Sequence, residues 1–186
     1  MAKYAVIGQR LPKVGAVAKV TGKVTFGVDV RMTGMLYGKI LRSPYPHARI
    51  VRIDASRAEA IPGVKAVIAG RDVPNVRVGF ALRDEYVLAR DEVRCIGDPV
   101  AAVAALDEET AEKAIATLDV DYEELPYVFD AAEAMQPGAP LVHKELGSYQ
   151  LSSLMGRQCN FVAGTNICNR VQRRRGDVEQ GFRESD

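Results

Sequence analysis

The residues that most often carry catalytic chemistry are scarce in this chain of 186 residues, which has no tryptophan, two histidines and three cysteines. His47 and His143 match no metal-ligand spacing and no catalytic triad, so neither a histidine-bound metal nor an independent small hydrolase is expected. Cys95, Cys159 and Cys168 form no CxxC pair and fit no zinc or iron–sulfur spacing. We therefore expect free thiols in a reducing compartment.

An excess of charge is also missing, because 25 basic and 24 acidic residues leave a net charge of +1. Neither nucleic acid nor an anionic membrane surface is therefore expected as a partner. The arginines at residues 173–175 are followed by Asp177 and Glu179, which predicts a solvated face or a contact between subunits. No run of about 18 apolar residues is present, and no apolar stretch follows Lys3 as in a signal peptide, so we expect a cytoplasmic protein.

Phosphate-binding loops are not recognisable either. Gly15, Gly22 and Lys23 in "GAVAKVTGKV" do not have the spacing of a P-loop, and no serine or threonine follows the lysine. The neighbouring "VTGKVTFG" contains no GxGxxG pattern. The sequence therefore predicts no nucleotide site in this part of the chain.

Strand patterns dominate the part of the chain that can build a core. Alternating apolar residues, or short apolar runs between turn residues, predict strands over 24–30, 35–44, 48–56, 64–70, 99–106 and 118–125. One or two further short strands are expected within "EYVLARDEVRC" at 85–95. The run "PVAAVAAL" is apolar on both faces, which places it in the middle of a sheet.

Four helix signals accompany these strands. A short helix is predicted with Asp54 or Ser56 as its N-cap and with Pro62 and Gly63 after its end. A second follows Asp107, and its inward stripe has the helical spacing of residues 111, 114, 115 and 118. Two more begin after Asp130 and Asp177.

The polar side chains that could suggest catalysis have simpler explanations. Acidic residues after Asp107 lie in the first turn of a helix, where carboxylates offset the helix dipole. The pairs Asp119/Asp121 and Glu123/Glu124 read as solvated strand positions. His47, in "SPYPHARI", is expected to bond to backbone, and His143 is expected to be exposed. The residues alone indicate a scaffold and no reaction centre.

Four motifs in order resemble the N-terminal region of the molybdenum-binding large subunit of the xanthine dehydrogenase and aldehyde oxidase family. They are "GQRLPKVGAVAKVTGKVTFGVDV", "GMLYGKILRSPYPHARIVRIDASRAEAIPGVKAVIAGRDVP", "YVLARDEVRCIGDPVAAVAALDEETAEKAIATLDVDYEELP" and "TNICNRVQRRRGDVEQGFRESD". The Gly-Asp-Pro turn and "ARDEVR" most resemble the 4-hydroxybenzoyl-CoA reductase alpha subunit. Ser185 stands where alanine is usual, and residues 141–164 depart from the family pattern.

The resemblance implies an α+β fold, the α/β hammerhead, with a mixed sheet and two to three helices. We expect an extended arm over 1–20, the hammerhead over 21–127, and a linker over 128–186 that leads toward a molybdopterin-binding domain. The complete enzyme is implied to use molybdopterin-molybdenum, [2Fe-2S] clusters and FAD. The implied partners are a molybdopterin-binding domain or subunit, an iron–sulfur subunit and an FAD subunit.

No catalytic, cofactor-binding or metal residue is carried over to this chain, because the family's cofactor residues and catalytic glutamate follow the point where it ends. The sequence therefore predicts the N-terminal scaffold portion of a molybdenum hydroxylase large subunit, inactive alone. The alternative is a stand-alone binding or assembly module that has the hammerhead fold and no catalysis. Substrate and oligomeric state are left open, as is the origin of the end at Asp186.

Overall fold

The computed structural model describes residues 6–80, 82–151, 160–173 and 175–185, and it divides into two units, Met1–Met35 and Leu36–Asp186. The first unit contains α1 (Ala16–Val20) and the 3-10 helix η1 (Gly27–Asp29), and neither helix buries a residue. Helix α1 lies within the arm that the sequence predicted to be extended. Gly15, at a φ of 75°, precedes it.

The predicted strand over residues 24–30 is wrong. Gly27–Asp29 form η1, and the Asp29 carboxylate accepts a hydrogen bond of 2.9 Å from the backbone N–H of Phe26. Such a local side-chain bond competes with strand pairing. Alternation of apolar residues predicts a strand only where a second strand is available, and none pairs with this segment among the described residues.

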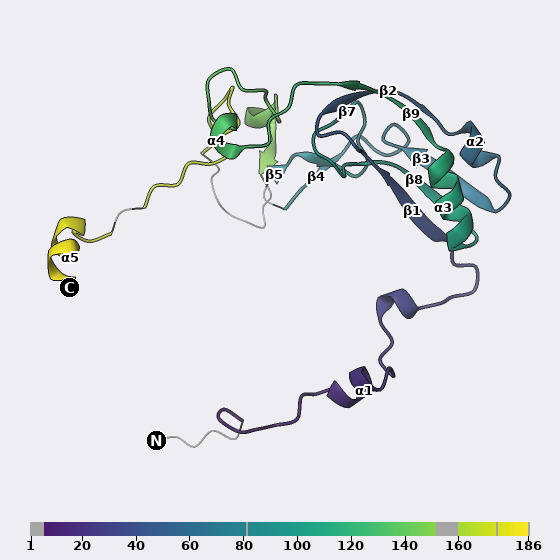
Figure 1. Cartoon of the computed structure of the whole chain (residues 1–186), viewed down its shortest axis with the longest axis horizontal. Helices are drawn as coiled ribbons and strands as arrows, with labels where there is room; N and C mark the ends of the chain where they lie inside the picture. The colour runs from purple at the N-terminus through teal and green to yellow at the C-terminus, as the bar shows by residue number, and fades with distance from the viewer. Residues whose placement is uncertain (1–5, 81, 152–159, 174, 186) are drawn as a thin grey trace. The chain divides into compact units, whose positions relative to one another are not determined.

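The second unit contains the strands and the remaining helices (Figure 1). Its strands are β1 (Tyr37–Arg42), β2 (Ala48–Asp54), β3 (Val64–Ala69), β4 (Arg77–Val78), β5 (Leu82–Arg83), β6 (Glu85–Tyr86), β7 (Glu92–Val93), β8 (Pro99–Ala105), β9 (Asp119–Glu124) and β10 (Gln150–Leu151). Its helices are α2 (Ser56–Glu59), α3 (Glu108–Thr117), α4 (Ala131–Ala134), the 3-10 helix η2 (Leu146–Ser148) and α5 (Val178–Glu184).

The first sheet has the strand order β1-β8-β3, so β8 is central, as its apolar sequence predicted. Ile40, Ala102 and Ile68 lie side by side across the three strands. A second sheet has the order β7-β2-β9, and β4–β6 and β5–β10 are two-stranded pairs. The strand pairs of the described residues are antiparallel, where the resemblance had implied a mixed sheet.

Helix α3 lies where the sequence predicted it, and it packs on the first sheet. The Asp107 carboxylate caps it by accepting a 2.8 Å hydrogen bond from the backbone N–H of Thr110. Ala114 is buried against Val103 of β8 and Ala58 of α2. The helix therefore covers one face of the sheet with its apolar stripe, as its 3.6-residue periodicity predicted.

The start of α2 differs from its prediction by one residue. Its N-cap is Ala55, which makes no side-chain cap bond. The Asp54 carboxylate instead accepts bonds from both the backbone N–H and the hydroxyl of Ser56, at 3.0 and 2.6 Å. Because Asp54 is the last residue of β2, its bond closes the turn that leads into the helix.

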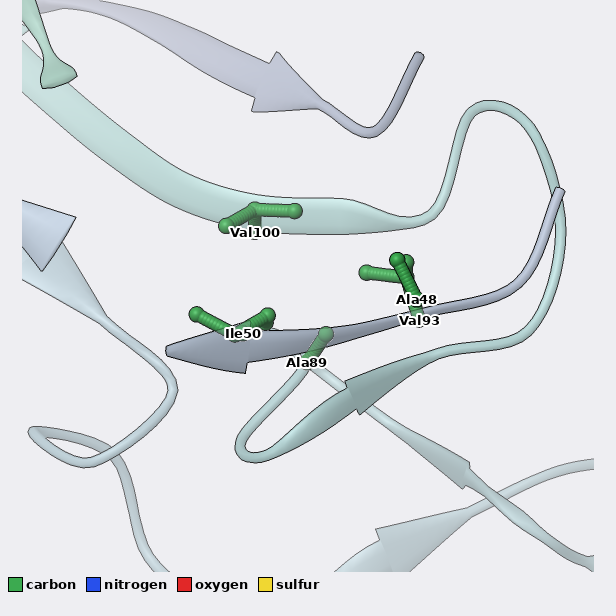
Figure 2. Close-up of a cluster of buried hydrophobic side chains, with 5 residues drawn as sticks. All are labelled: Ala48, Ile50, Ala89, Val93 and Val100. Carbon is green, nitrogen blue, oxygen red and sulfur yellow. The ribbon is translucent and has the colours of Figure 1, made fainter. Parts of the chain in front are cut away.

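A second apolar cluster joins β2, β7 and β8. Figure 2 shows its five side chains, Ala48, Ile50, Ala89, Val93 and Val100. A Cβ added to Gly70, at the end of β3, would overlap the carbonyl oxygen of Ala89, so this close approach requires glycine. The cluster therefore depends on close backbone packing as well as on aliphatic side chains.

Candidate functional site

Residues 77–98 meet residues 143–149 through several polar contacts, and we call this region the polar seam. His47, directly before β2, is buried at one end of it. Its Nδ1 lies 2.6 Å from the carbonyl oxygen of Pro126, and its Nε2 lies 2.7 Å from Oε1 of Glu92. The predicted bond to backbone is confirmed. The Pro126 carbonyl and the ionised Glu92 carboxylate are both hydrogen-bond acceptors.

Glu92 of β7 links His47 to the later part of the chain. The Lys144 Nζ donates to Glu92 Oε2 at 3.1 Å. Burial acts to raise the pKa of Glu92, but the hydrogen bonds from His47 and Lys144 outweigh it and hold the pKa below its ordinary value. Glu92 is therefore an ionised structural partner of two basic groups.

His143 is half-buried, so the prediction that it is exposed is wrong. Its ring meets Tyr149 edge to face with centroids 5.5 Å apart, and its Nδ1 lies 3.0 Å from the Tyr149 hydroxyl. Its Nε2 lies 3.8 Å from a carboxylate oxygen of Asp84. Burial, together with the charge of Arg94, lowers the pKa of His143. A low pKa and a tyrosine partner favour the neutral ring, which fits a packed position.

Arg77 of β4 makes the contacts at the end of the polar seam opposite His47. Its guanidinium lies 4.7 Å from the ring centroid of Tyr149 and 5.2 Å from that of Tyr86, and it pairs with Glu145. Burial acts to lower the pKa of Arg77, but the hydrogen bonds to Glu145 and Tyr86 raise it above its ordinary value. Arginine stacked on two aromatic faces stabilises the contact between distant segments. Sequence reasoning missed this residue because its partners Glu145 and Tyr149 lie about 70 positions away.

Local hydrogen bonds to the Asp98 side chain stabilise the Gly97-Asp98-Pro99 turn. The Asp98 carboxylate accepts bonds from the backbone N–H of Arg94 at 2.6 Å and from the Cys95 thiol at 3.0 Å. Although Cys95 as a whole is exposed, partial burial of its thiol, with the hydrogen bond and charge of Asp98, raises its pKa to about 11. A thiol with so high a pKa stays protonated near neutral pH and is a poor nucleophile.

The cysteines show no bond to each other where they can be described. Cys95 and Cys168 are free and exposed, while Cys159 lies outside the described residues. Within those described residues, no three His, Cys, Asp or Glu side chains are placed to hold a metal ion.

The paired carboxylates of β9 are solvated, as predicted. Arg52 of β2 donates to Asp121 at 2.9 Å and to Asp119 at 3.2 Å. Arg49 pairs with Glu123 at 2.6 Å. These cross-strand pairs fix the register of β2 against β9, and they need no catalytic role.

Two hollows adjoin the polar seam. One, of about 220 Å³, is lined by the carboxylates of Asp84, Glu85, Glu92 and Asp98 together with Arg94, whose buried Nε has no hydrogen-bond partner in the described structure. The other, of about 190 Å³, is mostly apolar and is lined by residues that include Ile96, Leu141 and the stacked rings of Tyr127 and Phe129. Cys95 lines both hollows, and its thiol, which stays protonated beside Asp98 near neutral pH, is a poor nucleophile there.

Comparison with known proteins identifies the family of this chain. The sequence pattern of the aldehyde oxidase and xanthine dehydrogenase a/b hammerhead domain matches residues 21–126. The chain belongs to this family. A probable xanthine dehydrogenase subunit of Bacillus subtilis is 40% identical over 169 residues, which are 90% of this chain and 20% of that protein. The nicotinate dehydrogenase large molybdopterin subunit of Eubacterium barkeri is 37% identical, over 86% of this chain and 39% of that protein.

A solved structure matches the fold of this chain. Quinoline 2-oxidoreductase from Pseudomonas putida matches with a TM-score of 0.68 and 34% identity, over 75% of this chain and 19% of that one. The chain thus spans about a fifth of the length of the Bacillus relative and of this structure. No helix among the described residues is long and apolar enough to cross a membrane.

The cofactors that the family resemblance implies do not fit the residues described. Molybdopterin carries phosphate, and the polar hollow would meet that negative charge with four carboxylates, those of Asp84, Glu85, Glu92 and Asp98, against the single guanidinium of Arg94. A [2Fe-2S] cluster takes four cysteine ligands, and this chain has three cysteines in all. We derive no chemical step through either group from the residues of this chain.

Proposed function

We propose that this chain is the N-terminal scaffold part of the large subunit of a molybdenum hydroxylase, and that it has no activity alone. The hammerhead match over residues 21–126 is the observation that carries the proposal. The contacts of Glu92 with His47 and Lys144, and of Arg77 with Glu145, support it, because each links segments that are far apart in the sequence. We assign the arm to 1–20, the hammerhead to 21–127 and a linker to 128–186.

In this proposal the complete enzyme hydroxylates or reduces an aromatic or aldehyde substrate at molybdenum in the cytoplasm. It passes electrons through [2Fe-2S] clusters to FAD on partner chains or domains. Within the family, the Gly97-Asp98-Pro99 turn and "ARDEVR" favour a subunit like the 4-hydroxybenzoyl-CoA reductase alpha subunit, and they leave the substrate open. The hammerhead shapes the approach to the active site and helps to bind the iron–sulfur subunit.

Purification of the tagged chain from its native cells tests this function. We expect it to bring down a molybdenum-bearing polypeptide, together with the visible absorption of flavin and of [2Fe-2S] clusters. Mass spectrometry identifies each polypeptide, and a tagged chain with a disrupted hammerhead core, Val103→Asp, is the control. A monodisperse chain that carries none of these partners would instead support a stand-alone binding module. The DNA downstream of the Asp186 codon gives an independent check, since the proposal expects a frame for the molybdopterin-binding domains.

A further inference from the structure

The β1-β8-β3 sheet has one covered face and one face that the described residues of the second unit leave exposed. Lys39 of β1 reaches α3 through Glu108 and Glu112, and Val103 of β8 is buried against α2 and α3. Because successive side chains of a strand alternate between faces, the neighbours of Lys39 and Val103 point the other way. At the end of the sheet nearest to β2, this second face is covered by the apolar cluster that contains Val100.

Beyond Val100 the second side consists of two rows across the strands, which we call the open sheet face. The rows are Gly38, Ala104 and Ala66, and Ile40, Ala102 and Ile68. Ile40 is 48% exposed and Ile68 is 39% exposed, and both lie on edge strands, while β8 contributes only alanines. The bulky side chains of the two rows therefore lie on the edge strands, and the central strand contributes only small ones.

The open sheet face lacks any charged or hydroxyl-bearing side chain in these two rows. On the covered side, by contrast, Lys39 meets Glu108 and Glu112 of α3. A sheet whose central strand is apolar on both faces is normally covered on both. A contiguous apolar surface that stays open on one side is typical of an interaction site.

We propose that the open sheet face binds an apolar segment of the molybdopterin-bearing polypeptide of the same large subunit, laid along β8. This inference rests on the proposed function. The Bacillus relative matches 90% of this chain with only 20% of its own length, so most of that subunit is available as the second layer. Glycine and alanine let a packed layer approach closely, and the absence of charge in the two rows selects an apolar partner over a charged one.

Two variants test the face without disturbing the chain itself. Ala66→Arg places a charge on an exposed position of an edge strand. A Cβ on Gly38 would meet only the carbonyl oxygen of Val103, at 3.9 Å, so Gly38→Val fits the free chain. Ala116→Arg, at an exposed position of α3, is the matched control. Circular dichroism and the urea midpoint establish that each variant is folded.

The probe is the part of the Bacillus subtilis relative that follows the segment matched by this chain, co-expressed with the tagged 186-residue chain. We expect the wild-type chain and Ala116→Arg to co-purify with it, and both face variants to lose roughly tenfold or more in affinity. A Gly38→Cys variant gives a second readout, because maleimide labelling at residue 38, read by peptide mass spectrometry, should be blocked in the complex.

The outcomes separate this inference from the proposed function. Equal binding by all variants, or unchanged labelling at residue 38 in the complex, overturns the face and leaves the scaffold role intact. If the wild-type chain does not bind the soluble probe, the scaffold role fails and the face assignment fails with it. If the chain instead forms a dimer that Ala66→Arg dissociates, the occupant is a second copy and the inference is wrong.

Discussion

The α3-covered side of the first sheet and the polar seam are held together by different kinds of contact. On the sheet, Val103, Ala58 and Ala114 join layers through carbon contacts that do not depend on pH. In the polar seam, Glu92 holds two basic groups that come from positions 45 residues before it and 52 residues after it. The first region is stabilised by shape and burial, and the second by ionisation and long-range geometry.

The largest expected effect concerns the apolar packing. Gly70→Ala should lower the free energy of unfolding by about 3 kcal/mol, because the added methyl overlaps the Ala89 carbonyl and forces the backbone apart. Gly38→Ala is the matched control, and it should change stability by less than about 1 kcal/mol, since its methyl has room. Urea unfolding measures both. Equal midpoints for the two variants would contradict the close approach at Gly70.

The next effect concerns the polar seam. His47→Ala should cost about 2 kcal/mol, because it leaves the Pro126 carbonyl and the Glu92 carboxylate without their shared donor. A double-mutant cycle with Glu92→Gln isolates the His47–Glu92 contact from the rest. A coupling energy of zero in that cycle would mean that the contact does not stabilise the fold.

A pH dependence should distinguish the two regions. The pKa of Glu92 in the folded chain lies below its ordinary value of 4.5, so the unfolded chain takes up its proton first as the pH falls. The stabilisation by Glu92 is therefore present above that ordinary value, and it is lost as the pH falls through the folded pKa. We expect urea midpoints between about pH 7 and about pH 3 to fall less in Glu92→Gln than in the wild-type chain.

The control for this pH effect is Val103→Ala, which should be less stable at every pH and should keep the wild-type slope. The same pH dependence in Glu92→Gln as in the wild-type chain would show that other carboxylates account for the acid sensitivity.

The smallest effects lie on the surface of α3. Asp107→Ala removes the cap on Thr110 and should lower the thermal midpoint measurably. Glu109→Gln removes only the exposed pair with Lys113 and should leave the midpoint unchanged within error. If Glu109→Gln proved more damaging than Asp107→Ala, the capping assignment would be wrong.

The elements that the sequence predicted are those whose signal is local. The position of β8 followed from its apolar run, and that of α3 from Asp107 and a 3.6-residue stripe, because burial of one face enforces each pattern. Residues 24–30 show the limit of this reasoning, since their alternation resembles a strand but Asp29 closes a local turn instead.

The polar seam could not be predicted in the same way. His143 reads as exposed because its sequence neighbours Lys144 and Glu145 are charged, yet the fold brings it against Tyr149 and Asp84. Arg77 carries no local signal for its contacts with Tyr149 and Glu145. Pairings between residues about 70 positions apart depend on the tertiary fold, and a single sequence does not reveal them.

The central proposal is that this chain is a structural scaffold and contains no catalytic centre of its own. The most direct measurement is the molybdenum content of the purified 186-residue chain, produced in cells that make molybdopterin and supplied with molybdate. We predict that elemental analysis finds no stoichiometric molybdenum and that the chain turns over no aldehyde or aromatic substrate. One molybdenum per chain, or turnover by the chain alone, would contradict this claim.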